Sequence, residues 1–260
     1  MFERKLTKED RMKKIIDSKT NKSLLLAFDH AVEHGPDKYP NVDLNPLRIL
    51  KIAIDGGANG IILHAGTARF VKKYIPKNFA LIIKLTARTS MVPEKSQIQS
   101  VVTTVDEAYN LGADGVAYTV YLGSDMEYEM LKNLAEVKKR CSELGLPLTG
   151  FMYPRSPNYK NKYDPKALEY AARVGAELGF DIVKTYYSGK SETYKNVVKN
   201  CFVPLLVAGG PETKTKEEFI NNVKGALDAG ARGFALGRNI WAKDGSVELL
   251  KEVREILSRY

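Results

Sequence analysis

The sequence predicts a (β/α)8 barrel, and three observations lead to this fold class. Four segments share a pattern in which a helix-like stretch ends at Gly and a short apolar stretch follows: 55–64, 110–121, 177–187 and 228–238. A helix that ends at Gly just before a strand is typical of repeated βα units. Four more short apolar stretches lie between them, at 23–29, 80–86, 146–153 and 203–210, which gives eight expected strands. These strands are apolar along their whole length, which indicates a parallel sheet covered by helices and closed on itself.

Helical periodicity follows most of the expected strands and is clearest at 124–144, 164–178, 214–229 and 246–257. The first 20 residues predict an extra N-terminal helix against the barrel, and no linker divides residues 1–260, so we expect one domain. A doubly wound open sheet is the alternative, but no G-x-G-x-x-G motif follows the first strand. In a (β/α)8 barrel, catalytic groups lie at the C-terminal ends of the strands.

Composition limits the function classes. The net charge is +9, but the 40 Lys and Arg residues are interleaved with 31 acidic residues, which favours an anionic small-molecule substrate over nucleic acid. No apolar run reaches the roughly 18 residues that a membrane span needs, and the charged N-terminus does not resemble a signal peptide, so we expect a cytoplasmic protein. Cys141 and Cys201 alone cannot form a disulfide framework or a cysteine zinc site.

The segment His30-Ala-Val-Glu33-His34 matches the H-x-x-E-H pattern of one class of zinc peptidases. That site needs both imidazoles on one face of a helix, whereas His30 directly follows the first expected strand and Gly35-Pro36 ends any helix after His34. We therefore expect no metal site. Asp29, at the end of the strand, and the three polar residues of the following loop are expected to line an active-site mouth; the alternative is an Asp that only caps the loop.

Lys184 stands inside an expected strand, in the segment DIVKTYYSG. Buried lysines are rare unless they are paired or functional. Burial and nearby cations lower the pKa of a lysine, and its free amine can attack a carbonyl carbon to form a Schiff base. Lys184 is therefore a candidate nucleophile. Lys84 competes for that role or acts as an electrostatic helper, and either lysine could instead form a structural ion pair with Asp29 or Glu33.

An imine mechanism also needs a proton carrier. Tyr153 ends the expected strand that precedes the strand of Lys184, so the two side chains can face each other across the mouth. A positioned general acid or base contributes about 10²- to 10⁴-fold to a reaction rate. The alternative is a strand-end tyrosine that only packs beside Pro154.

Glycines end two expected strands, in AGGP (208–211) and ALGRN (235–239). Gly permits the close backbone approach that offers N–H groups to an anion, and the loops after the last two strands form the recurrent phosphate site of this fold. Arg238 adds a forked charge. The candidate substrate- and phosphate-binding residues are His30, Lys84, Arg155, Ser188, Gly189, Gly209, Gly210, Gly237 and Arg238.

Together these segments resemble the archaeal-type class I fructose-1,6-bisphosphate aldolases of the deoxyribose-phosphate aldolase superfamily. The resemblance extends over about residues 20–242 and is carried by FDHAVEHGP, GVAYTVYLGS, MYPR, GAELGFDIVKTYYSG, AGGPETKT and ALGRNIW. Two positions depart from the family's pattern: Phe151 stands where Trp is frequent, and Ser156 where Gly is. A sister group, the 2-amino-3,7-dideoxy-threo-hept-6-ulosonate synthases, is similar in the MYPR segment, whereas Glu33-His34 and AYTVY favour the aldolases.

The resemblance implies Schiff-base cleavage of a sugar phosphate, fructose 1,6-bisphosphate, without a metal or another cofactor, and it implies a homo-oligomer, often a decamer. It matches Lys184 to the imine-forming lysine, Tyr153 to the proton-transferring tyrosine and Asp29 to an aspartate that organises the site. A non-catalytic phosphosugar-binding barrel, or a barrel with an RNA-binding surface, is the alternative from another class. Neither needs a strand lysine beside a strand-end tyrosine. The resemblance matches the C1 phosphate to the segments of Ser188, Gly189, Gly209, Gly210, Gly237 and Arg238.

Overall fold

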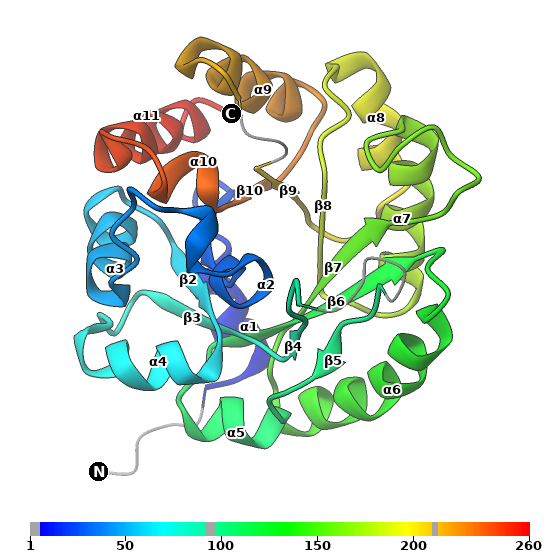
Figure 1. The fold of residues 1–260 in the computed structure, drawn as a ribbon, viewed down its shortest axis with the longest axis horizontal. Helices are drawn as coiled ribbons and strands as arrows, with labels where there is room; N and C mark the ends of the chain where they lie inside the picture. Colours follow the sequence, from blue (N-terminus) through cyan, green and yellow to red (C-terminus); the bar gives the residue numbers. More distant parts are fainter. Residues whose placement is uncertain (1–5, 92–96, 210–212) are drawn as a thin grey trace.

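A closed barrel of parallel strands occupies the centre of the computed structural model, which describes residues 6–91, 97–209 and 213–260 (Figure 1). Around the ring the strands follow the order β1-β10-β9-β8-β7-β6-β3-β2. Pairing of Ser23 in β1 with Gly233 in β10 closes the sheet, so the doubly wound alternative is wrong and the predicted (β/α)8 barrel is confirmed. The barrel strands are β1 (Ser23–Phe28), β2 (Gly60–Leu63), β3 (Ala80–Lys84), β6 (Gly115–Leu122), β7 (Leu148–Pro154), β8 (Ile182–Thr185), β9 (Leu205–Ala208) and β10 (Gly233–Leu236).

Helices form an outer ring around these strands (Figure 1). The helices predicted at 124–144, 164–178, 214–229 and 246–257 correspond to α6 (Glu127–Leu144), α7 (Pro165–Glu177), α9 (Lys216–Asp228) and α11 (Ser246–Leu257). The others are α3 (Pro46–Asp55), α4 (Ala65–Val71), α5 (Val105–Asn110), α8 (Ser191–Lys199) and the short α2 (His30–His34) and α10 (Arg238–Trp241). Two 3₁₀ turns, η1 (Pro36–Lys38) and η2 (Lys72–Tyr74), and a small antiparallel pair, β4 (Thr86–Ala87) with β5 (Ser100–Val101), complete these elements.

Local sequence signals fix the ends of these helices. At the start of α7, the Asp164 carboxylate accepts hydrogen bonds from the backbone N–H groups of Lys166 and Ala167, and Pro165 occupies the first turn. At the end of α6, Gly145 adopts a left-handed conformation with φ 63°, which Gly tolerates better than other residues. The chain can therefore turn from each helix directly into the next strand.

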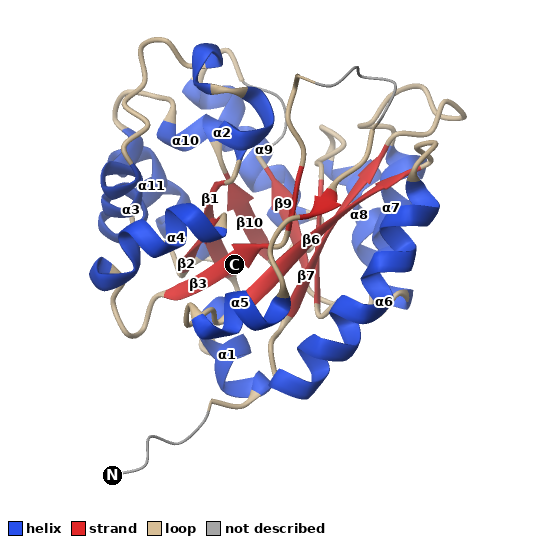
Figure 2. Ribbon diagram, turned by 60° about the horizontal axis from the view of Figure 1, so that its bottom comes forward, coloured by secondary structure: helices blue, strands red, loops and turns tan. Residues whose placement is uncertain are grey.

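The predicted N-terminal helix is present as α1 (Lys8–Ile15), which lies beneath the N-terminal ends of the strands (Figure 2). Met12, Ile15 and Ile16 pack against the side chains that fill the lower part of the barrel interior. The helix therefore closes the end of the barrel opposite the C-terminal ends of the strands.

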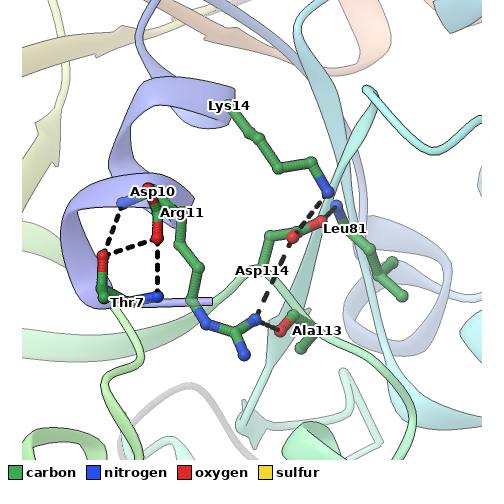
Figure 3. Close-up of polar contacts among 7 residues, drawn as sticks. All are labelled: Thr7, Asp10, Arg11, Lys14, Leu81, Ala113 and Asp114. Atoms are coloured by element: carbon green, nitrogen blue, oxygen red, sulfur yellow. Dashed lines mark hydrogen bonds and ion pairs between the residues drawn. The ribbon is translucent and has the colours of Figure 1, made fainter. Parts of the chain in front are cut away.

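Polar contacts also attach α1 to the barrel wall (Figure 3). Lys14 Nζ lies 2.6 Å from Asp114 Oδ1, just before β6, and the other carboxylate oxygen of Asp114 accepts a 3.1 Å hydrogen bond from the Leu81 backbone N–H of β3. The buried Arg11 donates to the Ala113 carbonyl at 2.6 Å. Asp114 thus joins α1 to two neighbouring strands.

Among the helices of the described ranges, none has both the length and the apolar character needed to cross a membrane.

Candidate active site

On several barrel strands, the last inward-facing residue has a polar side chain. Along a strand, alternate residues face the same side. In the lower layers these positions are apolar, for example Leu25 and Ala27 in β1, Ala80 and Ile82 in β3, and Ile182 in β8. Two residues further along the same strands, at their C-terminal ends, the inward-facing residues are charged or polar. A cavity of about 140 Å³ opens there, and its lining includes Asp29, Lys84, Tyr153 and Lys184.

Lys184 is one of the buried residues that line this cavity. It pairs in register with Phe151 of β7, and its Nζ lies 3.8 Å from the centroid of the Phe151 ring. Its residue exposure is 3%. The pKa of Lys184 is lowered to about 8: burial is the main cause, Lys84 contributes to the lowering, and Asp29 opposes it. Part of the Lys184 population is therefore a free amine at neutral pH.

Lys84 and Lys184 differ in their partners. Lys84 Nζ forms a buried ion pair with Asp29 Oδ2 at 3.3 Å. Burial alone would raise the pKa of Asp29, but Lys84, His30 and Lys184 hold it well below its usual range. Within the described ranges, neither a hydrogen bond nor an ion pair holds the Lys184 ammonium group. Of the two lysines weighed from sequence, Lys84 is therefore the ion-pair partner of Asp29.

Tyr153 stands two residues beyond Phe151 on β7, on the same inward face. Its ring stacks on Tyr186, which directly follows β8, with 4.5 Å between ring centroids and 19° between ring planes. Burial raises the pKa of Tyr153 well above its ordinary value, and the neighbouring Tyr186 and Asp29 raise it further. The phenol is therefore protonated at neutral pH in the free protein.

The first segment after β1 is a helix rather than the expected loop. Residues His30–His34 form α2, which begins after Asp29 and ends at Gly35 with φ 74°. Glu33 accepts a 2.7 Å hydrogen bond from the Tyr121 hydroxyl of β6, and this contact fixes the helix over the cavity. The loop prediction was wrong because one turn fits between the end of the strand and Gly35. The residues described contain no group of three or more His, Cys, Asp or Glu side chains that could hold a metal ion.

Glycines and Arg238 line the part of the cavity beside β9 and β10. Gly209 and Gly237 both contribute to the lining, and the Asn239 side chain donates a 2.6 Å hydrogen bond to the Gly209 carbonyl. A Cβ atom on Gly237 would lie 2.6 Å from Cε1 of His30, so this position has no room for a side chain. Gly210 lies outside the described residues.

Ser188 and Gly189 do not line the central cavity. They border a neighbouring hollow that shares Ala208 and Gly209 with it. The Ser188 hydroxyl contacts Thr193 Oγ1 at 2.9 Å and the Lys190 carbonyl at 3.3 Å, which places it in the turn before α8.

Arg155 lies on the other side of the cavity, directly after β7. Its Nη2 donates to the Tyr186 hydroxyl at 3.3 Å, and its guanidinium carbon lies 4.5 Å from the centroid of the Tyr121 ring. In the ring of strands, β8 and β9 separate β7 from β10. The cavity therefore carries arginines at two separate places, with the β8 lysine, Lys184, between them.

The profile of the DeoC/LacD family aldolases matches residues 23–243. The chain belongs to this aldolase family. A class 1 fructose-bisphosphate aldolase from Thermoproteus tenax is 38% identical over 245 residues, which cover 93% of this chain and 92% of the relative. The aldolase of the same name from Halobacterium salinarum is 31% identical over 242 residues, with 92% of each chain covered.

Two solved structures of archaeal aldolases show the same fold. One is an archaeal fructose-1,6-bisphosphate aldolase whose catalytic lysine is covalently bound to the carbinolamine intermediate of its substrate. It superposes with a TM-score of 0.89 at 36% identity and covers 97% of this chain and 100% of its own. Another archaeal fructose 1,6-bisphosphate aldolase structure gives a TM-score of 0.90, also at 36% identity, covering 98% of this chain and 100% of its own.

Several cavity-lining residues of this family member were not found from sequence. The alternation in GVAYTVYL could have indicated Thr119 and Tyr121, which share the inward face of β6 with Ala117. Gln99 donates a 2.9 Å hydrogen bond to the Tyr121 hydroxyl from the segment before β5, which carries no sequence signal. Phe151, Lys162, Tyr186 and Asn239 also line the cavity and were missed.

Proposed function

We propose that this chain is a Schiff-base, class I aldolase that reversibly cleaves fructose 1,6-bisphosphate into dihydroxyacetone phosphate and glyceraldehyde 3-phosphate in glycolysis and gluconeogenesis. The observation that carries this proposal is Lys184, a buried lysine with a lowered pKa and no ion-pair partner in the described ranges, beside the strand-end Tyr153. Membership of the DeoC/LacD aldolase family and the names of the similar enzymes support it.

In the first stage, the free amine of Lys184 attacks the C2 carbonyl carbon and forms a carbinolamine. Tyr153 begins as a neutral phenol because burial raises its pKa. The phenol donates its proton to the C2 hydroxyl, which leaves as water, and the protonated imine remains on Lys184. Asp29, held ionised by Lys84, stabilises the cationic nitrogen.

In the second stage, the protonated imine withdraws electrons from the C3–C4 bond. The Tyr153 phenolate left by the first stage takes the C4 hydroxyl proton, and glyceraldehyde 3-phosphate departs as the bond breaks. The Tyr153 phenol then returns this proton to C3 of the enamine, which regenerates the protonated imine. Water adds to the imine carbon, dihydroxyacetone phosphate leaves the Lys184 nitrogen, and the proton released restores the neutral phenol of Tyr153. Tyr153 alternates between acid and base, which is why its protonated starting state fits the cycle.

Two separate cationic parts of the cavity support a bisphosphate substrate. Gly209, Gly237 and Arg238 lie beside β9 and β10 and suit the C1 phosphate, with Gly210, Ser188 and Gly189 in the neighbouring segments. Arg155 and Lys162 lie on the β7 side and suit the C6 phosphate. His30 and Lys84 contribute to the lining between them. Phosphate contacts at both ends would hold C2 over Lys184, so binding energy remote from the reacting carbons assists the reaction.

The alternatives have less support. A phosphosugar-binding protein without activity would not need Lys184 beside Tyr153. The sister hept-6-ulosonate synthases share imine chemistry, but both relatives compared above are named fructose-bisphosphate aldolases.

Three further properties belong to this proposal. The reaction needs no metal or other cofactor because the protonated imine is the electron sink. The enzyme acts in the cytoplasm. It assembles as a homo-oligomer, and large exposed aromatic side chains support this. Analytical ultracentrifugation tests it by measuring the mass of the assembly. The exposed aromatic residues include Phe70, Tyr74, Tyr170 and Phe202.

Borohydride trapping tests the proposal. The protein is incubated with fructose 1,6-bisphosphate and a chelator, reduced with borohydride and digested, and the modified peptide is identified by mass spectrometry. We expect a triose-phosphate adduct on Lys184 in the wild type and in Lys132→Met, an exposed lysine of α6, and none in Lys184→Ala. An adduct with a deoxy-keto sugar phosphate alone would favour the synthase, and normal turnover in Lys184→Ala would eliminate imine chemistry.

A further inference from the structure

Tyr186 is a large, partly buried side chain of the cavity that the proposed mechanism does not use. It directly follows β8, and its ring lies nearly parallel to that of Tyr153, 4.5 Å away between centroids with 19° between planes. Tyr163, from the segment before α7, packs edge-on against the Tyr186 ring, with 5.1 Å between the ring centroids. The Tyr186 ring therefore contacts two other tyrosine rings, and its position limits the positions that Tyr153 can take.

Tyr186 also contacts Arg155. Arg155 Nη2 donates to the Tyr186 hydroxyl at 3.3 Å, and its Nη1 donates to the Pro154 carbonyl at 2.8 Å. The Arg155 guanidinium carbon lies 5.9 Å from the ring centroids of both Tyr153 and Tyr186. One side chain thus contacts both the candidate proton carrier and an arginine positioned to bind the distal phosphate.

We propose that Tyr186 is a positioning residue that couples Arg155 to Tyr153, so that occupation of Arg155 by the distal phosphate speeds proton transfer at Tyr153. The inference rests on the proposed function, because it concerns how the same site uses its second phosphate. This coupling would make Tyr186 a determinant of the enzyme's preference for a bisphosphate over a monophosphate substrate.

The physical basis of the coupling is that Tyr186 contacts both Arg155 and Tyr153 directly. A phosphate that binds Arg155 competes for the guanidinium N–H that Tyr186 accepts in the free protein. Any adjustment of the Tyr186 hydroxyl moves a ring in direct contact with Tyr153. A displacement of about 1 Å in a catalytic group can change a rate by about a hundredfold. A small shift of the stacked Tyr153 and Tyr186 rings is therefore sufficient to change the rate of proton transfer.

Steady-state kinetics with fructose 1,6-bisphosphate and fructose 1-phosphate test this coupling, because the two substrates differ only in the distal phosphate. In the wild type we expect kcat for the bisphosphate to exceed that for the monophosphate by about tenfold or more. Tyr186→Phe keeps the stacked ring but loses the hydroxyl. It should leave kcat for the monophosphate within about twofold and reduce kcat for the bisphosphate towards it.

Tyr186→Leu removes the ring as well, and kcat for both substrates should then fall, while trapping of the imine on Lys184 persists. Tyr128→Phe is the control, because Tyr128 is an exposed tyrosine of α6 that lines neither the central cavity nor the neighbouring hollow. It should leave both values unchanged. An unchanged ratio of the two kcat values in Tyr186→Phe, or a wild-type ratio near one, would overturn the coupling.

A measurement without turnover separates this inference from the proposed function. Tyrosines are labelled with ¹³C at Cζ, the Tyr153 signal is assigned by its loss in Tyr153→Phe, and inorganic phosphate is added. We expect the Tyr153 signal to move in the wild type and to move much less in Tyr186→Phe and Arg155→Lys. Equal movement in all three proteins would contradict the coupling even if the aldolase reaction is confirmed, and the expected pattern would support it even if fructose 1,6-bisphosphate is not the substrate.

Discussion

Lys84 and Asp29 form a buried ion pair across the barrel mouth, with 3.3 Å between Nζ and Oδ2. The two residues come from β3 and from the end of β1, which β2 separates. Lys84 is therefore engaged by Asp29. Lys184, on β8, also lines the cavity, and within the described ranges neither an ion pair nor a hydrogen bond holds it. The chemistry expected at Lys184 therefore depends on a contact between two other residues.

Imine formation should increase with pH through the pKa of Lys184. Burial lowers that pKa to about 8. The nucleophile is the free amine, which is the minor form below this pH and the major form above it. Single-turnover rates of imine formation should therefore rise from pH 6 to about pH 8 and level off above it. A rate that falls over this interval would show that another group controls the step.

Lys84→Met is the variant that tests the origin of this pKa. Loss of the Lys84 cation removes one cause of the lowered pKa and leaves the Asp29 carboxylate free to stabilise the Lys184 ammonium. Both changes raise the Lys184 pKa, so the midpoint of the rate profile should move up by about one unit or more. The exposed Lys132→Met should leave the midpoint in place.

Tyr153→Phe should separate imine formation from bond cleavage. The variant keeps the ring that stacks on Tyr186 but has no proton to donate or accept. Turnover should drop by about 10²- to 10⁴-fold. Water can supply the proton for dehydration slowly, so borohydride should still give an adduct on Lys184 after long incubation. Turnover close to that of the wild type would remove Tyr153 from the mechanism.

Gly237→Ala should disturb the site through His30. The added Cβ would meet Cε1 of His30 at 2.6 Å and the Ala27 carbonyl oxygen at 3.3 Å. We expect a loss of about 1–3 kcal/mol in the free energy of unfolding, measured by denaturant titration, together with a higher KM for the phosphorylated substrate. Gly66→Ala in α4 is the matched control, since its Cβ would have no atom within 4 Å. Equal free energies of unfolding and equal KM values in the two variants would mean that the contact with His30 affects neither stability nor substrate binding.

Asp114→Asn should detach α1 from the barrel wall (Figure 3). The change leaves Lys14 and the buried Arg11 without their carboxylate, although Lys14 keeps some access to water. We expect a loss of on the order of 2–3 kcal/mol in the free energy of unfolding, below the range for fully buried pairs. Lys13→Met breaks the exposed Glu9–Lys13 pair of the same helix and should have no measurable effect on stability. Because α1 lies at the opposite end of the barrel from the cavity, kcat should not change in either variant.

Periodic local patterns determined most of the fold. Each of the eight barrel strands and most of the longer helices were predicted from apolar runs, Gly at helix ends and helical spacing, because βα units repeat the same local chemistry. The small antiparallel pair β4–β5 was not predicted. The strand-end residues Asp29, Lys84, Tyr153 and Lys184 could be predicted as neighbours for the same reason: parallel strands place their C-terminal ends together. The short helix α2 could not, since one turn of helix has no periodicity to detect.

The sequence by itself determined the barrel, its N-terminal helix and the end of the barrel at which the polar residues gather. Only the tertiary structure decided which lysine pairs with Asp29, that Ser188 borders a separate hollow, and that Tyr186 joins Tyr153 to Arg155. These relationships connect residues on different strands and loops, at distances of a few ångströms. Strand register and loop path fix such distances, and a one-dimensional pattern contains neither.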